Sequence, residues 1–192
     1  MKYIFETVLP ANHEHGAVLK TYLPTNIIES LNKSMKFTDK IITSYNLIDE
    51  PDILILAYTL LTEAGCKVYK NQGILERHSY RSTSENTCVQ TPLAIHIDNF
   101  GGTEWKVYTC IIYTQKDNTI HGGNIDLFDE EPSFIDWLLN CFGYKNEYSK
   151  KIEVQIEAGL VLLMSGDVYH KPQDTYGIGT RNCTVVQLRS KK

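Results

Sequence analysis

The sequence predicts an α+β protein that is mainly β, with helices near its amino terminus. Helical signals are concentrated before about residue 70. From about residue 88 onward, short runs rich in Val, Ile, Thr and Tyr are separated by Gly, Asn, Asp and Pro, which is typical of strands and turns. A chain of 192 residues suits one domain. We therefore expect residues 1–70 to form a helical support for a β core that spans 88–192.

Two helices are predicted in the amino-terminal region. Thr25 or Asn26 can cap a helix that runs through Met35. Pro51 can open a second helix, which Gly65 ends. Apolar residues recur in this second segment at helical spacing: Leu54, Ala57, Tyr58 and Leu61.

Six short strands are predicted in the core, at residues 89–97, 107–114, 124–128, 152–156, 159–164 and 183–188. This number of strands in one small domain favours a sandwich or barrel over a parallel βαβ sheet. An insertion at about 130–151 carries apolar residues on one helical face: Phe134, Trp137, Leu138 and Cys141. We expect the insertion to pack on the barrel or to form part of its rim.

Composition excludes several classes of protein. The formal net charge of -4 supplies no overall attraction for nucleic acid or anionic lipid. Five scattered cysteines without a C-x-x-C pair indicate neither a disulfide framework nor a zinc knuckle. No apolar run approaches the roughly 20 residues that cross a bilayer, and no signal peptide is evident. We expect a cytoplasmic protein, in the host cytoplasm should the gene be viral.

A candidate metal site combines two distant parts of the chain. His96 and Asp98 stand at i and i+2 of a predicted strand, so both project to one side of it. Downstream, an apolar strand reaches a Gly-Asp turn and then His170. Two histidines and one carboxylate make a facial triad that binds iron(II) and leaves coordination positions open. Arg181, 11 positions further on, offers a bidentate partner for a carboxylate.

This arrangement resembles the iron(II)- and 2-oxoglutarate-dependent oxygenases, and most closely their prolyl-hydroxylase-like branch. The resemblance rests on His96-Ile97-Asp98, His170, Arg181 and the segment YTCIIYTQKDNTIHGGNIDLF, and it covers about residues 92 to 188. It implies a double-stranded β-helix core of the jelly-roll or cupin-like kind. It also implies iron(II), 2-oxoglutarate and molecular oxygen as cofactor and cosubstrates, with ascorbate as a further candidate, and hydroxylation of a protein or peptide side chain or of a small molecule.

The resemblance also suggests a role for Tyr113. Thr109, Ile111 and Tyr113 share one face by alternation, and similarity to the prolyl-hydroxylase branch places this face inward. Tyr113 would then donate its hydroxyl to the distal carboxylate of 2-oxoglutarate alongside Arg181, although a core tyrosine is the competing interpretation. The glycines at 122–123 are interpreted as turn residues without chemistry of their own.

Other polar residues have weaker functional interpretations. Cys183 and Gln187 share the alternation parity of Arg181, so they line the pocket or belong to a packed interior. His121 lies beside the glycine turn and is interpreted as an exposed histidine rather than a ligand. His13 and His15 have no visible third ligand and are interpreted as surface residues.

The segment at 70–90 is polar and rich in Ser, Thr and Asn. Its position before the metal-binding strand predicts a mobile loop over the site, with a passive surface excursion as the alternative. Arg77, Tyr80 and Arg81 are its candidate substrate-binding residues, and His78 is a further polar group in the segment that could hold a substrate.

Two alternatives to a hydroxylase remain open at this point. Nucleic-acid demethylases of the same superfamily place a second arginine after the first, and Arg189 follows Arg181 here, at a longer interval than theirs. A cupin-like metal-binding protein without oxygenase activity is the other alternative.

Overall fold

The computed structural model describes residues 2–9, 17–34, 41–83, 85, 88–89, 95–99, 104–128, 133, 135 and 151–191. The helical elements are α1 (Thr25–Ser34), η1 (Leu47–Asp49) and α2 (Pro51–Glu63). The strands are β1 (Glu6–Leu9), β2 (Val18–Tyr22), β3 (Ile42–Tyr45), β4 (Gly73–Ser82), β5 (Cys88–Val89), β6 (Trp105–Lys116), β7 (Ile120–Gly122), β8 (Ile125–Phe128), β9 (Lys151–Val154), β10 (Leu160–Ser165), β11 (Tyr169–Pro172), β12 (Thr175–Gly177) and β13 (Gly179–Lys191).

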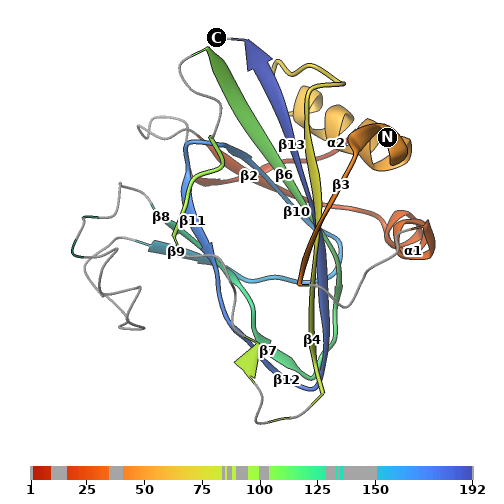
Figure 1. Ribbon diagram of the computed structural model, residues 1–192, viewed down its shortest axis with the longest axis vertical. Helices are drawn as coiled ribbons and strands as arrows, with labels where there is room; N and C mark the ends of the chain where they lie inside the picture. The colour runs from red at the N-terminus through yellow and green to blue at the C-terminus, as the bar shows by residue number, and fades with distance from the viewer. Residues whose placement is uncertain are drawn as a thin grey trace.

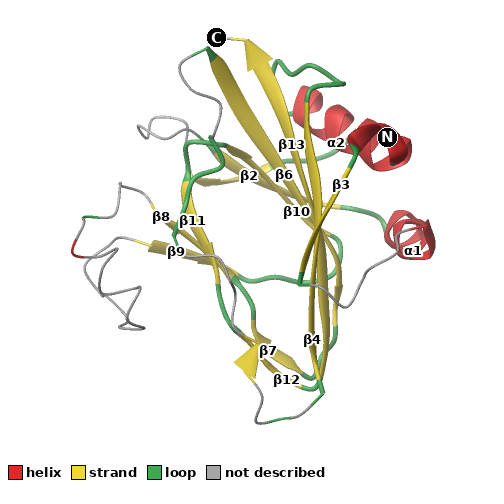
Figure 2. Cartoon of the chain, in the orientation of Figure 1, coloured by secondary structure: helices red, strands yellow, loops and turns green. Residues whose placement is uncertain are grey.

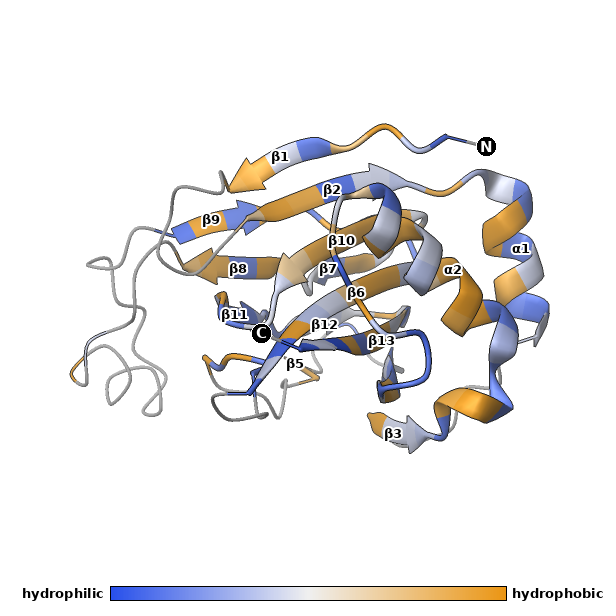
Figure 3. Ribbon diagram, turned by 90° about the horizontal axis from the view of Figure 1, so that it is seen from above, coloured by the Kyte–Doolittle hydropathy of each residue, from blue (hydrophilic) through white to orange (hydrophobic). Residues whose placement is uncertain are grey.

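A seven-stranded antiparallel sheet in the order β1-β2-β10-β6-β13-β4-β3 forms the largest layer. Two three-stranded sheets, β11-β8-β9 and β5-β12-β7, accompany it. Helices α1 and α2 lie on one side of the large sheet, and β8, β9 and β11 lie on the other (Figures 1 and 2). The view from above shows the same layering, with the apolar strands β6 and β10 between the helices and β8 (Figure 3). This is a jelly-roll arrangement with a helical cover.

Alternate residues of the central strands enter two separate cores. On β6, Cys110 and Ile112 pack with the helices, while Ile111 and Tyr113 face the smaller sheets. Strand β10 divides in the same way, with Leu163 on the helical side and Leu162 on the other. Because both faces of these strands are buried, their sequences are nearly continuous apolar runs. The cavity that contains the candidate site opens between the sheets, on the side away from the helices.

Most predicted elements are present. Both helices begin where predicted, and Gly65 follows α2 with φ of +87°. The predicted strands from 107 onward correspond to β6, β8, β9, β10 and β13. The predicted helical support region contains strands as well as the two helices, because β1, β2 and β3 lie within residues 1–70 and extend the large sheet at both edges.

The prediction of a loop at 70–90 was also wrong over its central part. Residues Gly73–Ser82 form β4, which pairs with β13 along its whole length and with β3 on its other side. Its charged side chains are accommodated by specific partners: the Arg77 guanidinium is buried and pairs with Glu50 at 2.6 Å. A strand with polar residues on both faces lacks the alternation that identifies strands in a sequence.

Several predictions lie outside the described residues. These are the histidines at 13 and 15, positions 90–94 of the first predicted core strand, and almost all of the predicted insertion at 130–151. In the part of the chain that is described, no helix has the length and apolar character to cross a membrane.

Candidate metal centre

The two halves of the predicted site meet through their backbones. The His96 amide donates to the His170 carbonyl at 3.0 Å, and the His170 amide donates to the His96 carbonyl at 2.9 Å. The Asp98 amide donates to the Gly166 carbonyl at 2.8 Å. The segment at 95–99 therefore runs beside β11. Of the strand predicted at 89–97, the described residues contain the end of β5 and the isolated bridge at His96.

The three predicted ligands converge. Asp98 Oδ1 lies 3.8 Å from His96 Nε2, and Asp98 Oδ2 lies 3.8 Å from His170 Nε2. One possible ligand atom from each residue lies within 4.8 Å of the others. Such a cluster can hold one divalent ion, and two imidazoles with one carboxylate suit iron(II).

Neighbouring groups orient two of these ligands. The Thr109 hydroxyl donates to Asp98 Oδ2 at 2.6 Å. His170 Nδ1 lies 3.0 Å from the Val168 carbonyl oxygen, so a proton on Nδ1 leaves Nε2 available as a ligand. Burial lowers the pKa of His170, which favours the neutral, metal-binding imidazole.

Arg181 is a buried cation that faces the same cavity. Its Nη1 donates to the Gly123 carbonyl, and its guanidinium lies 4.0 Å from the centre of the Tyr80 ring. Within the described ranges no carboxylate forms an ion pair with Arg181, and its Nε has no hydrogen-bond partner. The pKa of Lys116 is lowered by burial and then by the charge of Arg181. A buried arginine without an anionic partner can bind a ligand carboxylate.

Tyr113 lines this cavity, as the alternation predicted, and Thr109 shares its face through the contact with Asp98. Burial raises the pKa of Tyr113 well above its ordinary value, so its hydroxyl stays protonated and can donate a hydrogen bond. Its register partner on β13 is Cys183, two residues from Arg181.

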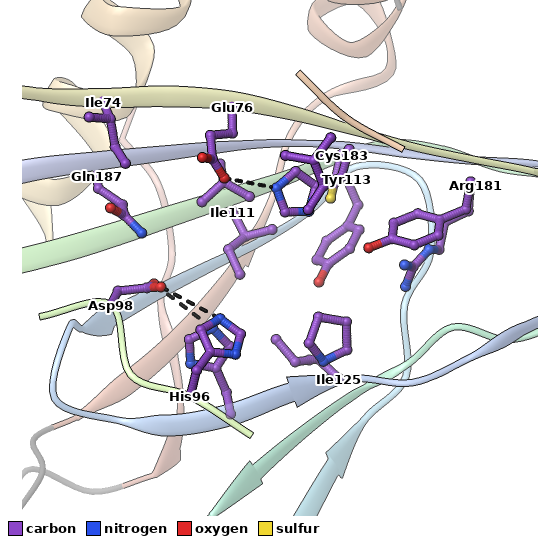
Figure 4. A pocket seen from close by; sticks show the side chains of 16 residues that line it. Ile74, Glu76, His96, Asp98, Ile111, Tyr113, Ile125, Arg181, Cys183 and Gln187 are labelled. Carbon is purple, nitrogen blue, oxygen red and sulfur yellow. Dashed lines mark hydrogen bonds and ion pairs between the residues drawn. The ribbon is translucent and has the colours of Figure 1, made fainter. Parts of the chain in front are cut away.

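The cavity has a volume of about 210 Å³ and is bounded by residues of both layers. Figure 4 shows His96 and Asp98 on one wall, with Glu76, Ile111 and Tyr113 facing them. Cys183 and Gln187 line it as well, and Cys183 also belongs to the packed core on this side of the sheet.

Of the three candidate substrate-binding residues, Tyr80 alone lines the cavity. Arg77 points to the opposite face of β4, where it also lies 4.4 Å from the centre of the Tyr45 ring. Arg81 shares that parity and is exposed. His78, the further polar candidate of this segment, also lines the cavity. The pocket-facing residue Glu76 was missed, because the segment was not recognised as a strand and its alternation was not applied.

The two glycines are turn residues with positive φ, as predicted, and Gly123 contributes to the site as well. A Cβ at Gly123 would lie 2.9 Å from Thr175 Oγ1 and 3.0 Å from Arg181 Cδ. Glycine therefore allows the close approach of the arginine side chain, and φ of +67° also favours it. His121 is exposed on β7 and does not belong to the metal cluster.

Fold and site together define a class: a double-stranded β-helix that carries a His-Asp-His constellation and a buried arginine in one cavity. Neither a protein-family model nor a curated protein matches the sequence significantly. Solved structures do share the fold.

Three structural neighbours share this fold. A prolyl-4-hydroxylase from Pseudomonas putida has a TM-score of 0.51 and 10% identity, with 93% of this chain and 94% of that chain covered. SnoK, a non-heme alpha ketoglutarate dependent carbocyclase from nogalamycin biosynthesis, has a TM-score of 0.54 and 12% identity, with 90% and 80% covered. HygX from Streptomyces hygroscopicus, with iron bound, has a TM-score of 0.53 and 15% identity, with 89% and 81% covered.

The chain covers 55% of the length of another neighbour, IDO from Bacillus thuringiensis, at a TM-score of 0.45. The neighbours above a TM-score of 0.5 confirm the double-stranded β-helix fold that the sequence resemblance implied.

Proposed function

We propose that this chain is an iron(II)- and 2-oxoglutarate-dependent dioxygenase that hydroxylates a prime substrate. The observation that carries the proposal is the pairing, in one cavity, of a His-Asp-His cluster with a buried arginine that has no carboxylate partner among the described residues. A metal site alone fits many proteins. The added cation fits a ligand that chelates the metal at one end and carries a carboxylate at the other.

The residues that would hold the metal are His96, Asp98 and His170, and their donor set suits iron(II). Iron(II), when bound, supplies the redox chemistry that couples 2-oxoglutarate and oxygen to succinate, carbon dioxide and a hydroxylated product. The protein's own groups bind and orient: Arg181 pairs with the distal carboxylate of 2-oxoglutarate, and the protonated Tyr113 hydroxyl donates to it. Thr109 fixes the Asp98 carboxylate.

As prime substrate we propose a protein or peptide side chain, with a small molecule as the alternative. A prolyl-4-hydroxylase and a carbocyclase of antibiotic biosynthesis are both fold neighbours, so the fold is compatible with either. Nucleic-acid demethylation gains no support, because Arg189 is not among the residues that line the cavity.

The test is succinate formation from 2-oxoglutarate by purified protein with iron(II), oxygen and ascorbate. We expect formation that depends on both iron and protein and that peptide libraries stimulate. A cupin-like metal-binding protein without oxygenase activity would bind the ion and form no succinate at any iron concentration, which would refute the proposal.

A further inference from the structure

The cavity wall formed by β4, β13 and β6 is a ladder of paired residues with two distinct ends. Arg181 is paired with Tyr80 at one end, and Gln187 is paired with Ile74 and Thr109 at the other. Strand geometry separates Arg181 from Gln187 by about 20 Å along β13. The wall is therefore longer than the cosubstrate region at its arginine end.

The position of the metal ligands distinguishes the two ends of this wall. Thr109 donates to Asp98 and is the register partner of Gln187, so the Asp98 ligand lies at the Gln187 end. Figure 4 shows Ile74 and Gln187 on the Asp98 side of the cavity and Arg181 on the opposite side. The proposed cosubstrate would span from the metal toward Arg181, which leaves the Gln187 end unused.

Two polar side chains line this unused end. Gln187 is 8% exposed and its amide makes no hydrogen bond within the described residues. The amide lines the cavity with hydrogen-bonding capacity to spare, so a ligand that enters there can pair with it. Glu76, two residues from Ile74 on β4, also faces the cavity, and its side chain is 30% exposed.

Two neighbouring side chains contact the carboxylate of Glu76, and some of its hydrogen-bond acceptor sites stay free. His78 Nε2 lies 3.2 Å from Glu76 Oε2, and the Ser44 hydroxyl donates to Oε1 at 3.4 Å. The pKa of Glu76 is lowered, chiefly by the hydrogen bond from His78, so the carboxylate is ionised at neutral pH. An ionised carboxylate has about four lone-pair sites, and these two contacts leave acceptor capacity. The surrounding Ile42 and Ile74 are aliphatic.

We propose that Glu76 and Gln187 form the subsite for the prime substrate and that they select an aliphatic chain ending in a cationic nitrogen, such as an ammonium group. This proposal rests on the proposed function for the identity of the subsite as a substrate site. The carboxylate of Glu76 accepts a charge-assisted hydrogen bond from the cation. The amide oxygen of Gln187 accepts a second one, while Ile42 and Ile74 contact the chain.

The test compares n-pentylammonium, 1-pentanol and pentanoate, which share an aliphatic chain and differ in their head group. Dissociation constants are measured by ligand-observed NMR titration under nitrogen, for protein alone and for protein loaded with iron(II) and 2-oxoglutarate. We expect n-pentylammonium to bind the wild type at least about tenfold more tightly than 1-pentanol, as one charge-assisted hydrogen bond provides. The substitution Glu76→Gln should remove this preference.

The matched control is Glu29→Gln, which removes one negative charge from the exposed face of α1 and should retain the preference. Should Glu76→Gln fail to fold, Gln187→Leu provides the second variant and should weaken n-pentylammonium binding several-fold. Equal affinity for n-pentylammonium and 1-pentanol in the wild type, or an unchanged preference in folded Glu76→Gln, would each overturn the proposal. So would tighter binding of pentanoate than of n-pentylammonium to the protein loaded with iron(II) and 2-oxoglutarate, in which Arg181 is already occupied.

These outcomes are separable from the proposed function, because binding requires no turnover. If the protein forms no succinate but binds n-pentylammonium in a Glu76-dependent way, the oxygenase proposal is refuted and the cation subsite is retained. Iron-dependent succinate formation without ammonium preference would retain the oxygenase and refute the subsite.

Discussion

The hydroxyl of Thr109 donates a 2.6 Å hydrogen bond to Oδ2 of Asp98. Both side chains are buried, so this contact fixes one carboxylate oxygen of the metal cluster. Hydrogen bonds to ligating groups typically change metal affinity 10- to 100-fold.

We predict that Thr109→Val weakens iron(II) binding about 10- to 100-fold while the protein stays folded, because valine keeps the shape and removes the donor. Anaerobic titration with iron(II) measures the effect. The matched control is Thr114→Val on the same strand, whose buried hydroxyl has no hydrogen-bond partner in the described structure. Equal affinities for both variants would show that the Thr109 contact does not support the ligand.

Arg181→Ala should strongly weaken 2-oxoglutarate binding and leave metal affinity nearly unchanged. Removing one partner of a buried ion pair costs about 3 to 5 kcal/mol, and the partner in this case is the cosubstrate. Calorimetric titration of the iron-loaded protein with 2-oxoglutarate, under nitrogen, gives the dissociation constant. Arg81→Ala removes an exposed arginine that does not line the cavity, so it should bind like wild type. An unchanged constant in Arg181→Ala would exclude the residue from the cosubstrate site.

Gly123→Ala should weaken 2-oxoglutarate binding as well as stability. Its Cβ would approach the Arg181 side chain at 3.0 Å and Thr175 Oγ1 at 2.9 Å. Gly65→Ala is the control, since Gly65 also has a positive φ of +87° but nothing lies within 4 Å of an added Cβ. A residue other than glycine at positive φ costs roughly 1 to 2 kcal/mol, so both variants should lose stability. Normal 2-oxoglutarate affinity in both would mean that the turn does not position Arg181.

The stability contributed by Glu76 should depend on pH. Its pKa is lowered from 4.5 in the folded state, chiefly by the hydrogen bond from His78. A carboxylate with a depressed folded-state pKa stabilises the fold above its unfolded pKa, and this contribution is lost as the pH falls through the folded value. Wild type should therefore exceed Glu76→Gln in free energy of unfolding at pH 7, and the difference should shrink as the pH is lowered through the lowered folded-state pKa of Glu76. A difference that stays constant or grows on acidification would contradict the assignment.

The sequence predicted best those positions at which a residue type has one plausible role, such as ligating a metal or packing in a core. His96, Asp98 and His170 were predicted as a cluster from alternation and order, and their side chains converge. The apolar strands β6, β10 and β13 were predicted because both of their faces enter cores. Local patterns of this kind persist in a sequence because burial constrains each position.

Strand β4 shows what local patterns omit. Its polar residues are stabilised by distant partners, such as Glu50 for Arg77 and Ser44 for Glu76, and such pairings follow from tertiary contacts. The role of Gly123 was missed for the same reason: the close approach of Arg181 joins residues that lie far apart in the sequence. The division of the cavity into two ends likewise depends on the register between β4, β13 and β6.

The most direct test of the central claim is a crystal structure of the protein grown under nitrogen with iron(II) and 2-oxoglutarate. We predict one metal ion bound to Nε2 of His96, Nε2 of His170 and a carboxylate oxygen of Asp98. The distal carboxylate of 2-oxoglutarate should pair with the guanidinium of Arg181, within reach of the Tyr113 hydroxyl. A metal ion held by other residues, or 2-oxoglutarate bound away from Arg181, would contradict the account.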